Sequence, residues 1–205
     1  MNYESIKIIK GKEKIILSAP HSVLHMRENA IRPKEIRTAD IVKKLATKRK
    51  VYSIYKIKNE NNDANWDEKC EYKETLKKII ESEKIKALID IHGMASFREQ
   101  DICIGINAGK NIYGKHKLVQ YMINIFNKYG FKNVTIDEPF GAKNENCVST
   151  YIAKKCKIPT FQIEINLKYR SAKYKEFMYY NDVLNAINEI IEQMIKEIWG
   201  VKIIK

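Results

Sequence analysis

The stretch ALIDIHG at residues 87–93 is a continuous apolar run that is interrupted by Asp90 and ends at His92 and Gly93. An apolar run of this length, without alternating polar residues, is typical of a strand that helices cover on both faces, as in a parallel sheet. We therefore predict a central, buried strand here. TFQIEIN at 160–166 has the same character and predicts a second one.

Further elements are predicted on both sides of these two strands. Short runs of β-branched residues predict strands within 5–18, as two strands around Gly11, and at 51–57, 101–107 and 133–139. Apolar residues at three- and four-residue steps predict helices at 33–48, 71–82, 115–129, 148–155 and 173–199. Pro33 stands at the start of the first of these helices, and residues 59–70 are expected to form a polar loop.

The alternation of strands and helices defines the fold class. It predicts an α/β protein, a three-layer αβα sandwich around a mixed, mostly parallel sheet. A chain of 205 residues suits one domain of this kind, and we assign residues 1–205 to it. Sheets of this type place their functional residues at the carboxyl ends of the strands.

The composition narrows the class of protein. Hydrophobic residues make up 44% and charged residues 31% of the chain, as in globular proteins, and no stretch approaches the about 20 apolar residues of a membrane span. The N-terminal residues lack the features of a secretory signal, so we expect a soluble, cytoplasmic protein. The four cysteines have no CxxC spacing and are expected to be reduced and not to bind metal.

The formal net charge of +13 raises the possibility of a nucleic-acid partner. However, lysines are spread through every segment, and only KKLATKRK at 43–50 is a local cluster, which a solvated helix face explains. We therefore do not expect nucleic acid as the main partner, although a basic nucleic-acid-associated module stays open as an alternative. A basic surface would also attract a small anionic substrate.

Two of the four histidines lie at the ends of predicted strands. His21 follows KIILSAP, and His92 ends the central strand. Zinc favours imidazole and carboxylate ligands, and a catalytic site leaves one position for water, so both histidines are candidate ligands. The alternatives are a loop histidine after Pro20 and a hydrogen-bonded core histidine. His25 could share a helical face with His21, but the segment lacks the glutamate of a two-histidine zinc motif.

Two carboxylates accompany these histidines. Asp90 points to the same side of its strand as His92, so it either orients that imidazole or caps a neighbouring helix. Glu164 interrupts a buried strand, where a carboxylate is costly unless it is paired or close to a metal. That position suits a general base, and the alternative is a solvent-facing residue on an edge strand.

At these residues the sequence resembles the N-formylglutamate amidohydrolase family and, more distantly, the zinc carboxypeptidases and the phage-type poly-γ-glutamate hydrolases. The resemblance covers most of the chain and depends on the order of several short motifs. The segments that carry it are SAPHS at 18–22, PKEIRTADIVKKLA at 33–46, NDANWDEKCEYKETL at 62–76, IDIHG at 89–93, REQDICIG at 98–105 and FQIEINLKYR at 161–170.

The resemblance implies one catalytic zinc and hydrolysis of an amide bond next to a carboxylate. By this likeness His21 is the first zinc ligand, His92 the last, and Glu35 the carboxylate between them, with Asp40 as the competing candidate. Glu164 corresponds to the base that activates the attacking water and later protonates the leaving amine.

The resemblance also suggests how the substrate is bound. Arg98 and Arg170 are placed to bind a substrate carboxylate, and Arg98 is the favoured residue for stabilising the oxyanion. The equal alternative for both is a solvated loop arginine. Asn144, in the loop before the helix at 148–155, is a further candidate for lining the pocket. N-formylglutamate, another N-acyl amino acid and a γ-linked peptide are the substrate options, and the alternative function is a binding protein of the same fold without catalysis.

Overall fold

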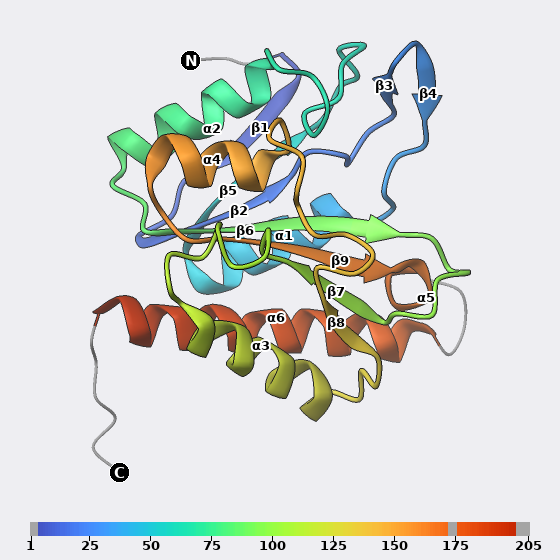
Figure 1. Cartoon of the computed structure of the whole chain (residues 1–205), viewed down its shortest axis with the longest axis vertical. Helices are drawn as coiled ribbons and strands as arrows, with labels where there is room; N and C mark the ends of the chain where they lie inside the picture. The colour runs from blue at the N-terminus through green and yellow to red at the C-terminus, as the bar shows by residue number, and fades with distance from the viewer. Residues whose placement is uncertain (1–3, 172–175, 200–205) are drawn as a thin grey trace.

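The computed structural model describes residues 4–171 and 176–199, which form one seven-stranded sheet with helices on both faces (Figure 1). The strands in chain order are β1 (Ile6–Ile9), β2 (Glu13–Ala19), β5 (Val51–Lys56), β6 (Ala87–Met94), β7 (Ile102–Gly105), β8 (Val134–Ile136) and β9 (Thr160–Asn166). Their order across the sheet is β1-β5-β2-β6-β9-β7-β8.

The sheet is mixed and mostly parallel, as predicted. Strands β5, β2, β6 and β9 pair in parallel, and so do β7 and β8. The pairs β1–β5 and β7–β9 are antiparallel. The two strands predicted to be buried, β6 and β9, lie side by side at the centre, and every residue of β9 is buried.

The helices form the two outer layers of the sandwich. The helices are α1 (Thr38–Arg49), α2 (Glu71–Ser82), α3 (His116–Lys128), α4 (Val148–Cys156), the short α5 (Leu167–Arg170) and α6 (Glu176–Trp199). Residues of α1, α3 and α6 share one apolar core with one face of the sheet, whereas α2 and α4 share a second core with the opposite face. Figure 1 shows α2 and α4 together on one side of the sheet and α3 and α6 together on the other.

Successive residues of the central strands divide between these two cores. In β6, Leu88 packs into the α2–α4 core and Ile89 packs into the α1–α3–α6 core. Both side chains are fully buried. A sheet covered on both faces needs apolar residues at every position of a strand, which explains the continuous apolar runs.

The segment before α1 differs from the prediction. The helix begins at Thr38 and not at Pro33, and Arg37 adopts a left-handed conformation with φ 65°. The Thr38 hydroxyl donates to the Glu35 carbonyl at 2.9 Å and closes this turn. Residues 33–37 therefore lie outside the helix, and the Glu35 side chain can reach the carboxyl ends of the central strands.

A second sheet of two short strands was not predicted. Strands β3 (His25–Arg27) and β4 (Ala30–Arg32) form an antiparallel hairpin in which Arg27 pairs with Ala30. The two turn residues, Glu28 and Asn29, both have positive φ values of 50° and 62°. Two such residues are what a tight turn compatible with strand twist requires.

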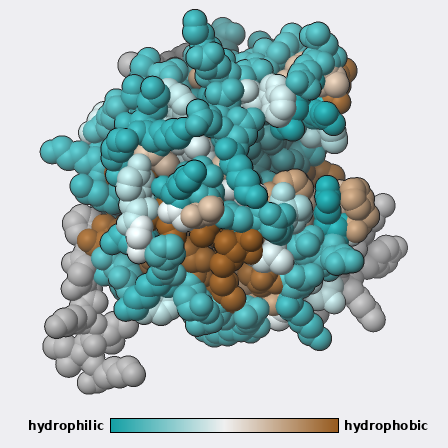
Figure 2. All heavy atoms as spheres, in the orientation of Figure 1, coloured by the Kyte–Doolittle hydropathy of each residue, from teal (hydrophilic) through white to brown (hydrophobic). Residues whose placement is uncertain are grey.

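The remaining boundaries agree within a few residues. The polar loop at 59–70 contains neither helix nor strand, and the first residues of the helix predicted at 173–199 lie outside the described residues. Among the described residues, no helix combines the length and apolar character needed to cross a membrane. The four cysteine thiols are free, and Cys70, Cys103 and Cys147 are buried. The face seen in Figure 2 is largely hydrophilic, with a hydrophobic area near its middle.

Candidate active site

The predicted site residues meet at the carboxyl ends of the central strands. His21 lies just beyond the end of β2, and His92 and Glu164 are direct neighbours across the parallel β6–β9 pair. Residues paired in this way project from the same face of a sheet. The strand order thus brings together three residues that are far apart in the sequence.

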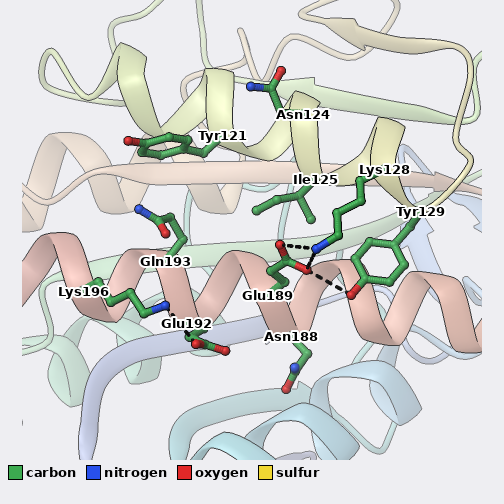
Figure 3. Close-up of a pocket in the computed structure, with 10 residues that line it drawn as sticks. All are labelled: Tyr121, Asn124, Ile125, Lys128, Tyr129, Asn188, Glu189, Glu192, Gln193 and Lys196. Carbon is green, nitrogen blue, oxygen red and sulfur yellow. Dashed lines mark hydrogen bonds and ion pairs between the residues drawn. The ribbon is translucent and has the colours of Figure 1, made fainter. Parts of the chain in front are cut away.

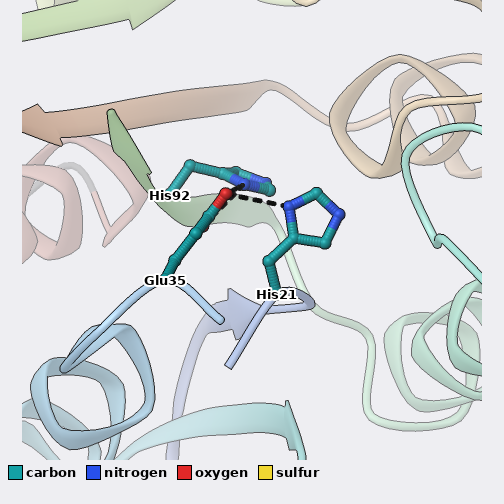
Figure 4. Close-up of side chains that lie close together, drawn as sticks. All are labelled: His21, Glu35 and His92. Carbon is teal, nitrogen blue, oxygen red and sulfur yellow. Dashed lines mark hydrogen bonds and ion pairs between the residues drawn. The ribbon is translucent and has the colours of Figure 1, made fainter. Parts of the chain in front are cut away.

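Glu35 joins the two histidines from the segment before α1 (Figure 4). Its Oε1 lies 2.9 Å from His21 Nδ1, and its Oε2 lies 3.2 Å from His92 Nδ1. The backbone N–H of Gly93 also donates to Oε2 at 3.0 Å. One donor atom from each of the three side chains falls within 4.8 Å of the others, which is a spacing that can hold a metal ion.

Asp40 occupies the first turn of α1 and is not part of this group of side chains. Glu35, in contrast, has its backbone N–H bonded to the His21 carbonyl at 2.9 Å, so main chain and side chain both fix it beside His21. Of the two carboxylates considered from the sequence, the structure places Glu35 between the histidines.

The far nitrogen of each imidazole faces a buried carboxylate. His21 Nε2 lies 2.8 Å from Asp63 Oδ1, and His92 Nε2 lies 3.1 Å from Asp90 Oδ2. A carboxylate at Nε2 favours the proton there and leaves the Nδ1 lone pair for a metal. Asp90 therefore lies where it can orient His92, and the Ser149 hydroxyl in α4 donates to the same oxygen at 3.3 Å.

These residues fit a zinc ion in chemistry and in surroundings. Two imidazole nitrogens and one carboxylate are a donor set found in catalytic zinc sites. Burial lowers the pKa values of His21 and His92, but the neighbouring carboxylates raise them by more, and the two histidines in turn lower the pKa of Glu35. A cation among these groups would satisfy the same negative charge that now attracts protons.

Glu164 lies on an interior strand, so the solvent-facing edge position considered from the sequence is wrong. Strand β9 is flanked by β6 and β7, and Glu164 is only 6% exposed. Burial, together with the nearby charge of Glu35, raises the pKa of Glu164 to about 7, although His92 opposes the shift. The Gln162 amide donates to its Oε1 at 3.1 Å. A carboxylate that gains and loses a proton near neutral pH suits general acid–base chemistry.

The two predicted arginines occupy different surroundings. Arg170 lines the cavity, but its guanidinium donates to the backbone carbonyls of Ile165 at 2.9 Å and Met94 at 3.2 Å, and also to that of Ile36. Arg98 is exposed, stacks over the rings of Phe97 and Phe140, and is not among the described residues that line the cavity. Arg170 therefore connects the ends of β6 and β9 to the segment before α1, whereas the described contacts of Arg98 are with aromatic rings.

The site opens into a cavity of about 740 Å³. Asn144 lines this cavity, and its Oδ1 accepts the backbone N–H of Asn146 at 2.9 Å. The cavity wall also carries several cationic side chains, namely Arg27, Arg32, Lys34, Lys143 and Arg170. This wall would favour a ligand with negative charge.

Arg27, Asp63 and Asn65 were not predicted as site residues from the sequence, and His25 was considered only on a helical face with His21. The His25 ring stacks on the His21 ring with centroids 4.0 Å apart, and Asp63 accepts from Arg27 Nε at 2.7 Å. The Asn65 amide lies 3.2 Å from His92 Nε2. Asp63 and Asn65 belong to the segment NDANWDEKC, which carried part of the family resemblance. Their place in that segment was the sequence signal that could have identified them as site residues.

A second groove lies between α3 and α6, and several of its polar lining residues form hydrogen bonds or ion pairs with one another (Figure 3). Glu189 accepts from Lys128 and from the Tyr129 hydroxyl, and Glu192 pairs with Lys196. This groove lies away from the strand ends, and we assign no function to it.

Comparison with known proteins shows the fold. No model of a known protein family and no curated protein sequence matches the chain. Among solved structures, a gene product of Agrobacterium tumefaciens matches with a TM-score of 0.67 and 13% identity over 95% of this chain and 94% of the other. N-formylglutamate amidohydrolase from Ralstonia eutropha matches with a TM-score of 0.61 and 11% identity over 93% and 98%.

A bacteriophage poly-gamma-glutamate hydrolase matches with a TM-score of 0.52 and 12% identity over 92% of this chain and 91% of that one. The chain therefore has the three-layer fold shared by these amidohydrolases and hydrolases, over nearly its full length. The fold family expected from the short sequence motifs is confirmed at the level of structure.

Proposed function

We propose that this protein is a zinc-dependent hydrolase that cleaves an amide bond in an N-acyl amino acid resembling N-formylglutamate, or in a small γ-linked peptide. The observation that carries the proposal is the convergence of His21, Glu35 and His92 beside Glu164 at the ends of β2, β6 and β9. The names of the structural neighbours are consistent with amide hydrolysis.

His21 and His92 would hold the metal through Nδ1, and Glu35 would hold it through its carboxylate. A zinc ion at such a site polarises a carbonyl group and lowers the pKa of water. Asp63 and Asp90 would keep both imidazoles in the ligating tautomer and orientation.

Glu164 is the group that moves protons in this proposal. As a carboxylate it takes a proton from the attacking water, and as a carboxylic acid it returns this proton to the leaving amine. Burial raises its pKa towards the neutral range, and the Gln162 amide donates to one carboxylate oxygen and fixes its position. The cationic cavity wall would bind a substrate carboxylate.

The test begins with the metal content of the purified protein after incubation with zinc. We expect about one zinc per chain in the wild type, and a loss of zinc in His21→Ala and His92→Ala, while His116→Ala, which changes an exposed histidine outside the site, keeps it. Equal zinc content in all four proteins would overturn the assignment of the ligands.

The second step tests hydrolysis of a panel of N-acyl amino acids and γ-linked dipeptides. We expect activity that a chelator removes and zinc restores. Glu164→Gln should retain zinc and lose about 100-fold or more in kcat, because the amide cannot accept the proton. A Glu164→Gln variant with full kcat would exclude Glu164 as the base, and zinc binding without hydrolysis of any member would favour a metal-binding protein without this activity.

A further inference from the structure

We propose that Arg27, on the β3–β4 hairpin, is the residue that binds a second carboxylate of the substrate, one that is remote from the scissile amide. This inference rests on the proposed function and deepens it, because it assigns the residue that would distinguish acidic from neutral substrates.

Arg98 and Arg170, the two arginines predicted from the sequence to bind a carboxylate, are less suited to this role than Arg27. The guanidinium of Arg170 donates to backbone carbonyls, and Arg98 stacks on the rings of Phe97 and Phe140 and is not among the described residues that line the cavity. Arg27 lines the cavity, and its side chain is 30% exposed. It therefore combines access to a ligand with a fixed position.

The geometry of Arg27 leaves its binding edge available. Nε donates to Asp63 Oδ2 at 2.7 Å, and the guanidinium lies over the Trp66 ring, 5.2 Å from its centroid. Its two terminal nitrogens have no hydrogen-bond partner among the described residues. An arginine binds a carboxylate through two parallel N–H groups, and stacking on an aromatic ring holds the planar group in place.

The hairpin is anchored to the site at two points. His25 stacks flat on His21, and Arg27 reaches Asp63, which itself contacts His21 Nε2. Asp63 contacts Arg27 through one oxygen and His21 through the other. The position of Arg27 is therefore tied to the imidazole that would bind the metal.

The same chain of contacts indicates which substrate group Arg27 can reach. One carboxylate and one imidazole ring separate its guanidinium from Glu35. A carboxylate attached directly next to the scissile amide would be too close to the metal centre to reach this far. A carboxylate at the end of a side chain, as in a glutamate residue, extends further from the scissile amide, and Arg32 on the same hairpin adds positive charge to the cavity wall.

The experiment compares zinc-loaded wild type with Arg27→Gln, Arg27→Lys and Arg49→Gln on N-acetyl-L-glutamate and N-acetyl-L-glutamine, which differ only in the side-chain charge. Arg49 is the matched control, because it pairs with Asn188 and Glu192 on α6, away from the cavity. We expect Arg27→Gln to raise KM for the acidic substrate about tenfold to a hundredfold more than it raises KM for the neutral substrate. Arg27→Lys should retain part of the preference.

A purely structural role for Arg27, through Asp63 and His21, would lower activity on both substrates equally, and that result would overturn the proposal. The melting temperature and zinc content of each variant are measured in parallel. If Arg27→Gln loses zinc or fails to fold, the Arg27→Lys variant decides, because a point charge without the planar fork should still weaken discrimination between the two substrates.

Calorimetric binding of glutarate and of uncharged glutaramide, to both the metal-free and the zinc-loaded protein, separates this inference from the proposed function. We expect glutarate to bind wild type at least tenfold more tightly than Arg27→Gln, and glutaramide to bind both equally. This result without any hydrolysis would leave Arg27 as a carboxylate site and remove the enzymatic proposal. Equal binding of glutarate to both proteins would overturn the role of Arg27.

Discussion

His21 and Asp63 form a buried pair in which Nε2 lies 2.8 Å from Oδ1. Burial raises the pKa of Asp63, but His21, the Asn65 N–H and Arg27 lower it by more, so that the carboxyl group is ionised. The ionised group holds the proton of His21 on Nε2 and directs Nδ1 towards Glu35. The polar loop, through Asp63, thus determines which nitrogen of the imidazole is available to a metal.

We predict that Asp63→Asn lowers the zinc affinity of the protein by about 10- to 100-fold, because it weakens the contact that fixes the orientation of His21. The affinity is measured by competition with a chromophoric chelator. Asp40→Asn is the control, because Asp40 lies in α1 outside the group of candidate ligands, and it should retain the wild-type affinity. Equal affinities for Asp63→Asn and wild type would contradict the role given to Asp63.

The central part of the fold could be predicted because its sequence signals are local. Strand β9 occupies the residues predicted for it, 160–166, since burial on both faces requires an unbroken apolar run. His92 and Glu164 stand out for the same reason, as polar groups within such runs. The structure shows that the two residues lie directly opposite each other across the β6–β9 pair.

The neighbourhood of Glu35 could not be predicted in detail. Apolar spacing from Pro33 onward favoured a helix. The helix begins only after Arg37, whose left-handed conformation is usual for glycine and could not be predicted from an arginine. The β3–β4 hairpin was missed because its strands have only three residues each and its turn, Glu28-Asn29, also lacks glycine. Arg27 and His25 reach the site only through that hairpin.

Gly93 allows the close approach of Arg170 to β6. A Cβ atom at this position would lie 2.2 Å from Nη2 and 2.3 Å from Cζ of Arg170, whose guanidinium is held by the backbone carbonyls of Ile165, Ile36 and Met94. We predict that Gly93→Ala destabilises the protein by about 1 to 3 kcal/mol, since β6 or Arg170 must shift. Chemical denaturation measures this loss.

The cause of this loss is tested with a double variant. If the clash is with Arg170, Gly93→Ala should cost much less free energy of unfolding in the Arg170→Ala background than in the wild type. Additive costs would show that the two residues are not coupled and would contradict the steric explanation.

Ionisation of Asp101 makes the free energy of unfolding depend on pH in the acid range. Burial raises its pKa, but the Lys168 ammonium, 2.6 Å from Oδ1, and the backbone N–H groups of Asn133 and Lys132 lower it by more. Because the pKa is lower in the folded state, the stabilisation is complete above about pH 4 and is lost as the pH falls through the folded-state pKa. We predict that Asp101→Asn costs about 1 to 2 kcal/mol at pH 7 and less near pH 3. Denaturation curves at both pH values measure the difference, and a cost that does not change with pH would contradict this origin.

Lys73 connects the two loops that contain Asp67 and Asn146. Its side chain is fully buried, and its ammonium donates to the Asp67 carbonyl at 2.6 Å and to the Asn146 carbonyl at 2.7 Å. Lys73→Met fills a similar volume but leaves both carbonyls without their donor, so we predict a loss of about 1 to 3 kcal/mol in the free energy of unfolding. Lys78→Met, an exposed position on the same helix, is the control and should change stability little. Hydrogen exchange should also become faster in residues 62–69 and 142–147, and unchanged exchange there, together with wild-type stability, would show that the ammonium does not hold these loops.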